Sequence, residues 1–185
     1  MLWPFSHFLK PRTPSRGTIE VIYGMIVAQA REPVFYQALG VPDTVNGRFD
    51  MVLLHLWMVL RRMNRAGDHA GLAQSLFDRF CSDMDHNLRE LGTGDLAVPR
   101  RMREFGEAFY GRTAAYDLAL AAGEGPLADA LCKNIFNGQQ LEQARRLAAY
   151  VQRAVADLTS LDDETLASGG WQFSSPRAFG LSEAN

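Results

Sequence analysis

Residues 51–60, MVLLHLWMVL, decide how this chain folds. Nine of these ten residues are apolar, and His55 is the exception. The run is too short for a membrane-spanning helix, which needs about 20 residues, and it does not alternate apolar and polar residues as a half-buried strand does. A helix that is hydrophobic on all sides is buried, so the run predicts the central helix of a bundle.

Hydrophobic residues recur at helical spacing on both sides of this run. The expected long helices cover about 18–31, 47–65, 68–91, a segment from Pro99, one around 127–135, and 139–158, with short pieces after Pro33 and near 160–164. We therefore predict an all-α fold, a single-domain bundle of six to eight helices with short loops and irregular termini. Its parts are a flexible tail at 1–16, the helical domain at 17–168 and a loose tail at 169–185, with docking of Trp171 and Phe173 back onto the domain as the alternative for that tail.

The same patterns predict which side chains form the structural core. His55 and Trp57 lie in the central run, Phe77 and Phe80 on an apolar stripe of the 68–91 helix, and Phe109 on the helix that begins near Pro99. A buried His normally finds a hydrogen-bond partner, so His55 is interpreted as structural. Gly106 and Gly111 lie inside that same helix, where glycine indicates the close approach of another backbone.

The net charge, the cysteines and the absence of known catalytic motifs exclude several classes of function. The formal net charge of −2 argues against a general nucleic-acid binder, so no DNA partner is expected. Cys81 and Cys132 have no CxxC spacing and are interpreted as reduced, buried thiols in a reducing compartment. We find no secretory signal, nucleophile elbow, phosphate loop or dinucleotide motif. The sequence thus predicts a cytoplasmic protein that is not an enzyme and carries no cofactor.

One polar cluster keeps an enzymatic alternative open. Asp83, His86 and Glu90 follow one another at i, i+3 and i+7, and carboxylates with a His at i+3 occur at metal sites in helical bundles. No other helix offers a matching Glu-x-x-His, and this face is expected to point to solvent, opposite the apolar stripe. A helical metal-carboxylate enzyme is therefore the alternative, and the main prediction assigns no metal.

A longer motif surrounds this cluster. Residues 80–95, FCSDMDHNLRELGTGD, fit the pattern F-x-x-D-M-D-x-x-L-R-E-x-G-x-G-D. This block resembles the core of the ubiquinol–cytochrome c chaperone family. The resemblance extends in order from about 19 to 160 and includes LHLW at 54–57, Val98-Pro99, FYGR at 109–112, Tyr116 and Asn134.

The resemblance implies an all-helical assembly chaperone for respiratory complex III that binds newly made cytochrome b or another subunit of that complex. It also implies contacts with the ribosome or a small partner protein. Because the chain lacks a long presequence, it is identified as a bacterial member, which suggests peripheral contact with the inner face of the inner membrane. A ribosome or membrane adaptor without chaperone activity is the second alternative.

Such a chaperone must hold an apolar segment reversibly, for instance as a helix in an aromatic-lined groove with charges at the rim. The candidate client- or partner-binding residues are those of the dense polar block and its expected neighbours. They are Asp83, Asp85, Arg89 and Glu90 at the rim, with Tyr110 and Arg112 nearby.

Overall fold

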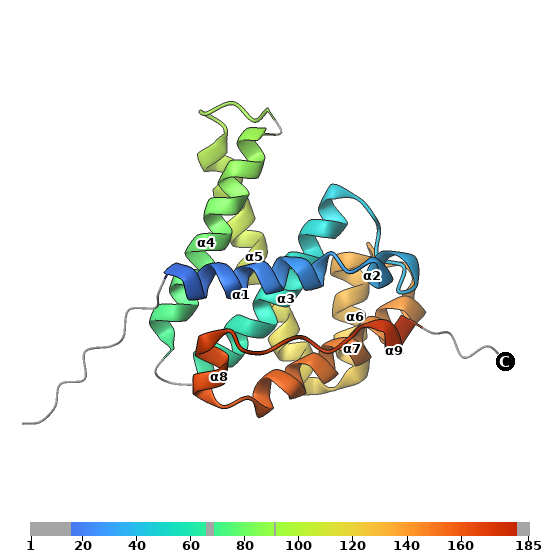
Figure 1. Cartoon of the computed structure of the whole chain (residues 1–185). Coiled ribbons are helices and arrows are strands. Elements are labelled where there is room, and N and C mark those ends of the chain that lie inside the picture. The colour runs from blue at the N-terminus through green and yellow to red at the C-terminus, as the bar shows by residue number, and fades with distance from the viewer. Residues whose placement is uncertain (1–15, 66–68, 91, 181–185) are drawn as a thin grey trace, which may run out of the picture.

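The computed structural model describes residues 16–65, 69–90 and 92–180, in which every regular element is a helix (Figure 1). The all-α prediction is therefore confirmed. The elements are α1 (Arg16–Ala30), α2 (Pro33–Gln37), α3 (Val45–Arg65), α4 (Ala70–Glu90), α5 (Val98–Ala122), α6 (Glu124–Ile135), α7 (Leu141–Ser160), α8 (Asp163–Ser168) and α9 (Arg177–Gly180). The predicted tail at 1–16 lies outside the described residues except for Arg16, which begins α1. None of the described helices is both long and apolar enough to cross a membrane.

Helix α3 is the axis of the fold. Every residue from Asp50 to Leu60 is buried, as the apolar run predicts. Helices α1, α4, α5, α6 and α7 all pack against α3. Removing so much apolar surface from water is the main favourable term in folding, because each fully buried large side chain contributes about 1.5–3 kcal/mol. The core of the molecule is therefore the layer of side chains around α3.

Helices α4 and α5 form an antiparallel pair whose far end projects from the body (Figure 1). Along α4, the last buried residue is Phe80, and the described side chains from Cys81 to Glu90 are all at least partly exposed. We call this projecting part, residues 81–90 and 92–104, the arm. Val98 is buried at the start of α5, whereas Met84 and Leu88 on α4 are only half covered.

The segment after α8 corrects one prediction. We call residues 169–180 the strap, since they cross the body between α1 and α7 and end in the single turn of α9 (Figure 1). Trp171 is only 6% exposed, and Phe173 and Phe179 pack against the core. The expected loose tail at 169–185 is therefore wrong for residues 169–180, and residues 181–185 lie outside the described part.

The predicted role of the α5 glycines is also wrong. A Cβ added at Gly106 or Gly111 would meet no atom within 4 Å, so no backbone approaches these positions. The close approach occurs instead at Gly47 in α3, where a Cβ would lie 2.0 Å from the carbonyl oxygen of Pro42. Glycine at 47 therefore lets the loop before α3 fold back onto the first turn of the helix.

The two cysteines differ in burial. Both are free thiols, but Cys132 is buried while Cys81 is only half-buried on the arm, which departs from the prediction that both are core residues. Burial raises the pKa of the Cys81 thiol, and the nearby carboxylate of Asp78 raises it further. The thiol form is therefore favoured at neutral pH.

Candidate functional site

A groove opens where α3, α4 and α5 meet. It has a volume of about 430 Å³ and is bounded by the C-terminal half of α3, the first half of α4 and the middle of α5. A cavity of this volume lies within the range of ligand sites in proteins. Its lining residues are Trp57, Leu60, Arg61, Asn64, Ala70, Ala73, Gln74, Phe77, Phe109, Tyr110, Thr113 and Asp117.

Aromatic rings form much of this groove. Phe77 lies 5.0 Å from Phe109 and 6.0 Å from Tyr110 between ring centroids, and Phe109 lies 5.6 Å from Tyr110. Trp57 and Phe109 are buried, Phe77 is half-buried, and the side chain of Tyr110 is 64% exposed. Buried rings hold the lining in place, and Tyr110 offers an apolar face to anything that enters. Tyrosine and tryptophan are the residues that most often dominate binding interfaces.

One ion pair closes the polar side of the groove. The Arg61 Nε donates to Asp117 Oδ1 at 2.9 Å, and the Trp57 indole Nε1 donates to the same oxygen at 3.3 Å. The Arg61 side chain is 10% exposed and the Asp117 side chain 52% exposed. Because the two charges offset each other, the groove offers a mainly apolar surface with one carboxylate at its edge.

The structure does not bring the predicted rim residues together, because successive positions on a helix turn to different neighbours. Asp83 faces α1, where its carboxylate accepts a 2.8 Å hydrogen bond from the Tyr23 hydroxyl and lies 3.6 Å from Arg79. Burial raises the pKa of Tyr23 well above its usual value, and the hydrogen bond to Asp83 adds to this. The expectation that Asp83 points to solvent is therefore wrong, and the residue fastens α4 to α1.

The other polar residues of the motif lie on the arm. Arg89 pairs with Asp85 at 2.7 Å and also with Asp95, which joins α4 to the turn before α5. The hydrogen bond from Arg89 lowers the pKa of Asp85. His86 and Glu90 form an exposed pair at 3.1 Å. Of the six candidates, the structure brings only Asp85 and Arg89 into direct contact.

Tyr110 and Arg112 point to different sides of α5, since two residues correspond to about 200° of helical rotation. Tyr110 lines the groove, whereas Arg112 forms an ion pair with Asp50 of α3. Asp50 is only 8% exposed, and burial raises its pKa, against the opposing effect of the Arg112 charge. Arg112 therefore compensates a buried carboxylate.

The alternative of a metal-carboxylate enzyme finds no support in this geometry. Asp83 turns to Tyr23 while His86 pairs with Glu90, so the three side chains do not converge. Across the ranges 16–65, 69–90 and 92–180, no group of three or more His, Cys, Asp or Glu residues could hold a metal ion.

Of the residues predicted to be structural, His55, Phe80, Trp57 and Phe109 are buried and Phe77 is half-buried. His55 is fully buried between two partners. Its Nδ1 lies 2.7 Å from the Met51 carbonyl oxygen, which can only accept, so Nδ1 carries the proton and Nε2 accepts from the Tyr150 hydroxyl at 2.8 Å. Burial lowers the pKa of His55 to about 4, so the ring is neutral at physiological pH.

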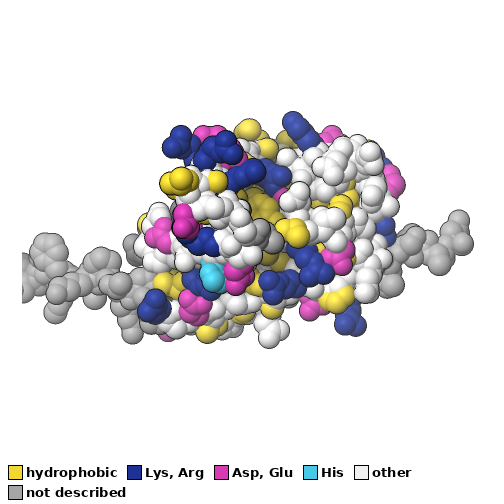
Figure 2. All heavy atoms as spheres, turned by 90° about the horizontal axis from the view of Figure 1, so that it is seen from above, with side chains coloured by type: hydrophobic (Ala, Val, Ile, Leu, Met, Phe, Trp, Pro, Cys, Tyr) yellow, Lys and Arg dark blue, Asp and Glu magenta, His cyan; other side chains and the backbone are white. Residues whose placement is uncertain are grey.

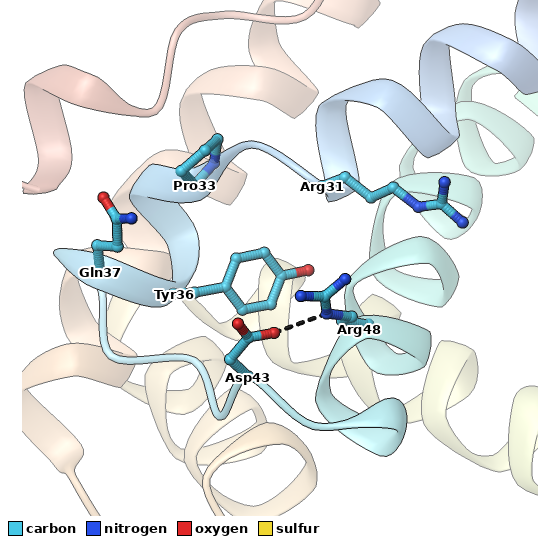
Figure 3. A pocket seen from close by; sticks show the side chains of 6 residues that line it. All are labelled: Arg31, Pro33, Tyr36, Gln37, Asp43 and Arg48. Atoms are coloured by element: carbon cyan, nitrogen blue, oxygen red, sulfur yellow. Dashed lines mark hydrogen bonds and ion pairs between the residues drawn. The ribbon is translucent and has the colours of Figure 1, made fainter.

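A second cavity, of about 240 Å³, lies beside α2 (Figure 3). Arg48 pairs there with Asp43 at 2.6 Å and lies over the Tyr36 ring, while the guanidinium of Arg31 points away from that ring (Figure 3). The Tyr36 hydroxyl donates to the Ala30 carbonyl at 2.7 Å. Because Arg48, Asp43 and Tyr36 already have partners, this cavity is a weaker candidate than the groove of α3, α4 and α5.

The exposed surface of the arm carries several ion pairs. Seen from above, basic and acidic side chains are mixed on it, and hydrophobic side chains lie in the hollow beside it (Figure 2). Arg100 and Arg101 share the carboxylate of Glu104, at 3.7 and 3.5 Å. These exposed pairs contribute little to stability, typically below about 1 kcal/mol each.

Sequence reasoning found Tyr110 but missed Arg61, Thr113 and Asp117 as neighbours of one groove. Arg61 lies in the last turns of α3, where a cation is common at any helix end and signals no site. Asp117 carries no motif, and its contact with Trp57 and Arg61 depends on how α5 crosses α3. A weak signal exists in hindsight, since Tyr110, Thr113 and Asp117 follow one another at i, i+3 and i+7 on one helical face.

Comparison with known proteins points to one family. The model of the family described as ubiquinol-cytochrome C chaperone matches residues 37–173. The chain is 31% identical over 137 residues to "Ubiquinol-cytochrome-c reductase complex assembly factor 1" of Xenopus laevis, covering 71% of this chain and 68% of the relative. It is 29% identical over 150 residues to "Protein CBP3, mitochondrial" of Saccharomyces cerevisiae, covering 77% of this chain and 44% of the yeast protein.

A solved structure agrees in fold and sequence. The crystal structure of the Cbp3 homolog from Brucella abortus superposes with a TM-score of 0.79 at 40% sequence identity. The superposition covers 87% of this chain and 91% of the Brucella chain. The similarity therefore includes nearly the whole of that solved chain.

Proposed function

Because this chain belongs to the ubiquinol-cytochrome C chaperone family, we propose that it is an assembly chaperone of ubiquinol–cytochrome c reductase. It binds newly made cytochrome b, or a related subunit, and promotes its entry into the complex. The frog relative carries the assembly role in its name. This chain spans less than half of the yeast relative, so the activity is proposed here for the part that the two share.

The observation that carries the proposal is the aromatic groove between α3, α4 and α5. An assembly chaperone needs a surface that takes up apolar polypeptide and lets it go again, and a helix lying in a hydrophobic groove is a common solution. Tyr110 is the exposed anchor of the groove, and the buried rings of Trp57 and Phe109 keep its lining rigid. Rigid walls reduce the entropy lost on binding, which favours affinity without any large contact area.

The client segment proposed for this groove is an amphipathic or apolar helix. The Asp117 carboxylate is half exposed at the edge, although its partner Arg61 is nearly covered. A cationic residue on the client helix, one or two turns from the residue that contacts Tyr110, would meet the Asp117 carboxylate. The proposal is thus a helix with one apolar face and a Lys or Arg beside it.

We also propose that exposed residues of the arm bind a partner other than the client helix. Asp85, Arg89 and Glu90 lie on the exposed arm, and we keep them as partner-binding residues outside the groove. Asp83 and Arg112 are assigned instead to holding the helices together, given their bonds to Tyr23 and Asp50. A ribosome or a small partner protein would be met by the arm in this scheme.

The proposal includes no catalytic step, cofactor or metal. The proposed location is the cytoplasm of a bacterium, including the inner face of the inner membrane, where a membrane-embedded subunit is met as it is made. The similarity to the Brucella abortus protein supports the bacterial assignment.

The experiment is a capture assay in cells that lack the wild-type chain and express a tagged full-length variant. Tyr110→Ala removes the exposed anchor and is expected to lower cytochrome b recovered per chaperone about tenfold, the effect of losing about 1.4 kcal/mol at an interface. The matched control is Leu118→Ala on the same helix, which removes a side chain that is 76% exposed but does not line the groove. Circular dichroism confirms that both variants are folded.

Three results are informative. Loss of capture in Tyr110→Ala alone supports the groove. Equal capture by both variants contradicts the groove as the client site. If the wild-type chain recovers no cytochrome b, the chaperone assignment fails and the adaptor without chaperone activity is favoured.

A further inference from the structure

The strap lies as an extended peptide in a channel that the helices leave open. Helices α1 and α7 each pack on α3, but within the described residues they have few direct contacts with each other, and the strap runs between them (Figure 1). At its start, Gly169 lies against Val21, Ile22 and Met25 of α1, and at its end Gly180 lies against α2. The strap therefore fills a channel whose floor is α3 and whose sides are α1 and α7.

Alternate residues of the strap serve as its anchors. Trp171 is buried, Gln172 is exposed, and Phe173 points inward again, as in an extended chain whose side chains alternate between two sides. The ring of Phe173 meets His55 edge-to-face at 5.1 Å between centroids, and Trp171 lies 5.2 Å from Phe173. The channel thus holds the strap's own aromatic, polar, aromatic sequence in extended form.

Few hydrogen bonds hold the strap in the channel. Gln29 of α1 donates from Nε2 to the Ser174 carbonyl oxygen at 3.0 Å, and the Ser174 hydroxyl donates to Asp157 of α7. The strap backbone from residue 169 to residue 180 makes no backbone–backbone hydrogen bond to the described helices α1, α3 or α7. A segment held by a few side chains, and not by a ladder of main-chain bonds, opens locally at low cost.

The conformational entropy lost on ordering the strap opposes its docking in the channel. Ordering twelve residues of irregular chain costs backbone and side-chain entropy at each of them. The strap recovers that cost mainly through Trp171, Phe173 and Phe179. Another peptide that offers the same anchors in extended form would meet the same contacts.

We infer that the channel between α1 and α7 is a second peptide-binding surface, occupied in the free protein by the chain's own strap. Its external ligand is an extended polypeptide segment with two aromatic residues separated by one polar residue. This surface is distinct from the groove of α3, α4 and α5, and it takes extended chain where the groove takes a helix. Gln29 links the strap to the channel wall, since it donates both to the Ser174 carbonyl oxygen and to the hydroxyl of the buried Tyr150.

The first test uses a fluorescent peptide with the sequence of residues 169–180 and the full-length protein. Phe173→Ala in the protein weakens its own strap without altering the channel. Fluorescence anisotropy should give this variant a Kd at least tenfold below that of the wild type. A peptide carrying Ala in place of its Trp and its first Phe is the matched control and should not bind.

The result that overturns the inference is peptide binding by neither protein, or equal binding of the control peptide. Should Phe173→Ala fold poorly, Ser174→Ala removes only the hydroxyl bonded to Asp157 and serves in its place. Tyr110→Ala should bind the peptide like the wild type, so that failure of the groove and failure of the channel are told apart.

Hydrogen exchange of the wild-type protein provides the second test. The indole Nε1–H of Trp171 donates to the Leu166 carbonyl oxygen at 3.1 Å and is buried, so its exchange requires the strap to open. It should exchange at least a hundredfold faster than the buried amides of α7, because the strap opens without global unfolding. Equal protection in the strap and in α7 would mean that the strap leaves only when the protein unfolds, which overturns the inference.

Discussion

The buried His55 ring makes the stability of this protein depend on pH in a calculable way. In the folded protein its pKa is lowered to about 4 from an ordinary value of 6.5, because burial disfavours the imidazolium. Protonation would also remove the acceptor that the Tyr150 hydroxyl uses at Nε2. The unfolded chain therefore binds a proton at His55 at higher pH than the folded protein does.

The sign and size follow from this difference. Above the unfolded pKa of 6.5 both states are neutral, and the full stability is present. As pH falls from 6.5 towards 4, the unfolded state gains a proton that the folded state does not, so the free energy of unfolding decreases. With about 1.4 kcal/mol per unit of pKa, the expected loss from about pH 7.5 to about pH 4.5 is about 2.5 kcal/mol.

Urea denaturation followed by circular dichroism at a series of pH values measures this loss. The matched control is His55→Gln, which keeps a polar side chain able to bond to Met51 and Tyr150 but does not titrate. Other groups, including the buried Asp50 carboxyl, titrate alike in both proteins and cancel in the comparison. If the two stability profiles run parallel between about pH 4.5 and 7.5, the account of His55 as a neutral buried group is refuted.

Two further perturbations test the packing. Gly47→Ala is expected to lower the free energy of unfolding by about 2 kcal/mol or more, because the new Cβ would overlap the carbonyl of Pro42. Gly111→Ala places its Cβ in open space on α5 and should raise the free energy of unfolding by about 0.5–1 kcal/mol. Similar effects of the two substitutions in urea denaturation would contradict this difference in packing. Arg112→Leu leaves the Asp50 carboxylate buried without its cation and should cost about 3 kcal/mol at neutral pH. The double variant with Asp50→Leu should recover much of that stability, and a double variant as unstable as Arg112→Leu would speak against an uncompensated charge.

The fold was predictable because its elements carry a periodic hydrophobic signal. The buried run in α3 and the stripe ending at Phe80 in α4 both indicate helices from sequence alone. The sequence predicts the strap only as an alternative, in which Trp171 and Phe173 dock back, because an irregular segment has no period and only its contacts with α1, α3 and α7 order it.

The site was predictable only in part. Adjacency in sequence suggested that Asp83, Asp85, Arg89 and Glu90 form one surface, but helical rotation turns Asp83 towards α1 and leaves the others on the exposed sides of the arm. Conversely, the groove joins residues 60 positions apart, such as Trp57 and Asp117, whose proximity depends on how two helices cross. Local sequence patterns do not encode that crossing.

The central claim is that a client polypeptide lies in the groove of α3, α4 and α5, and site-specific photo-crosslinking tests it most directly. A photoreactive residue replaces Thr113, which lines the groove, or Arg145 on α7, which does not. Each variant is then irradiated while cytochrome b is being translated. The account predicts a crosslinked product from position 113 that position 145 does not give. Equal products from both positions, or a product from 145 alone, would contradict it.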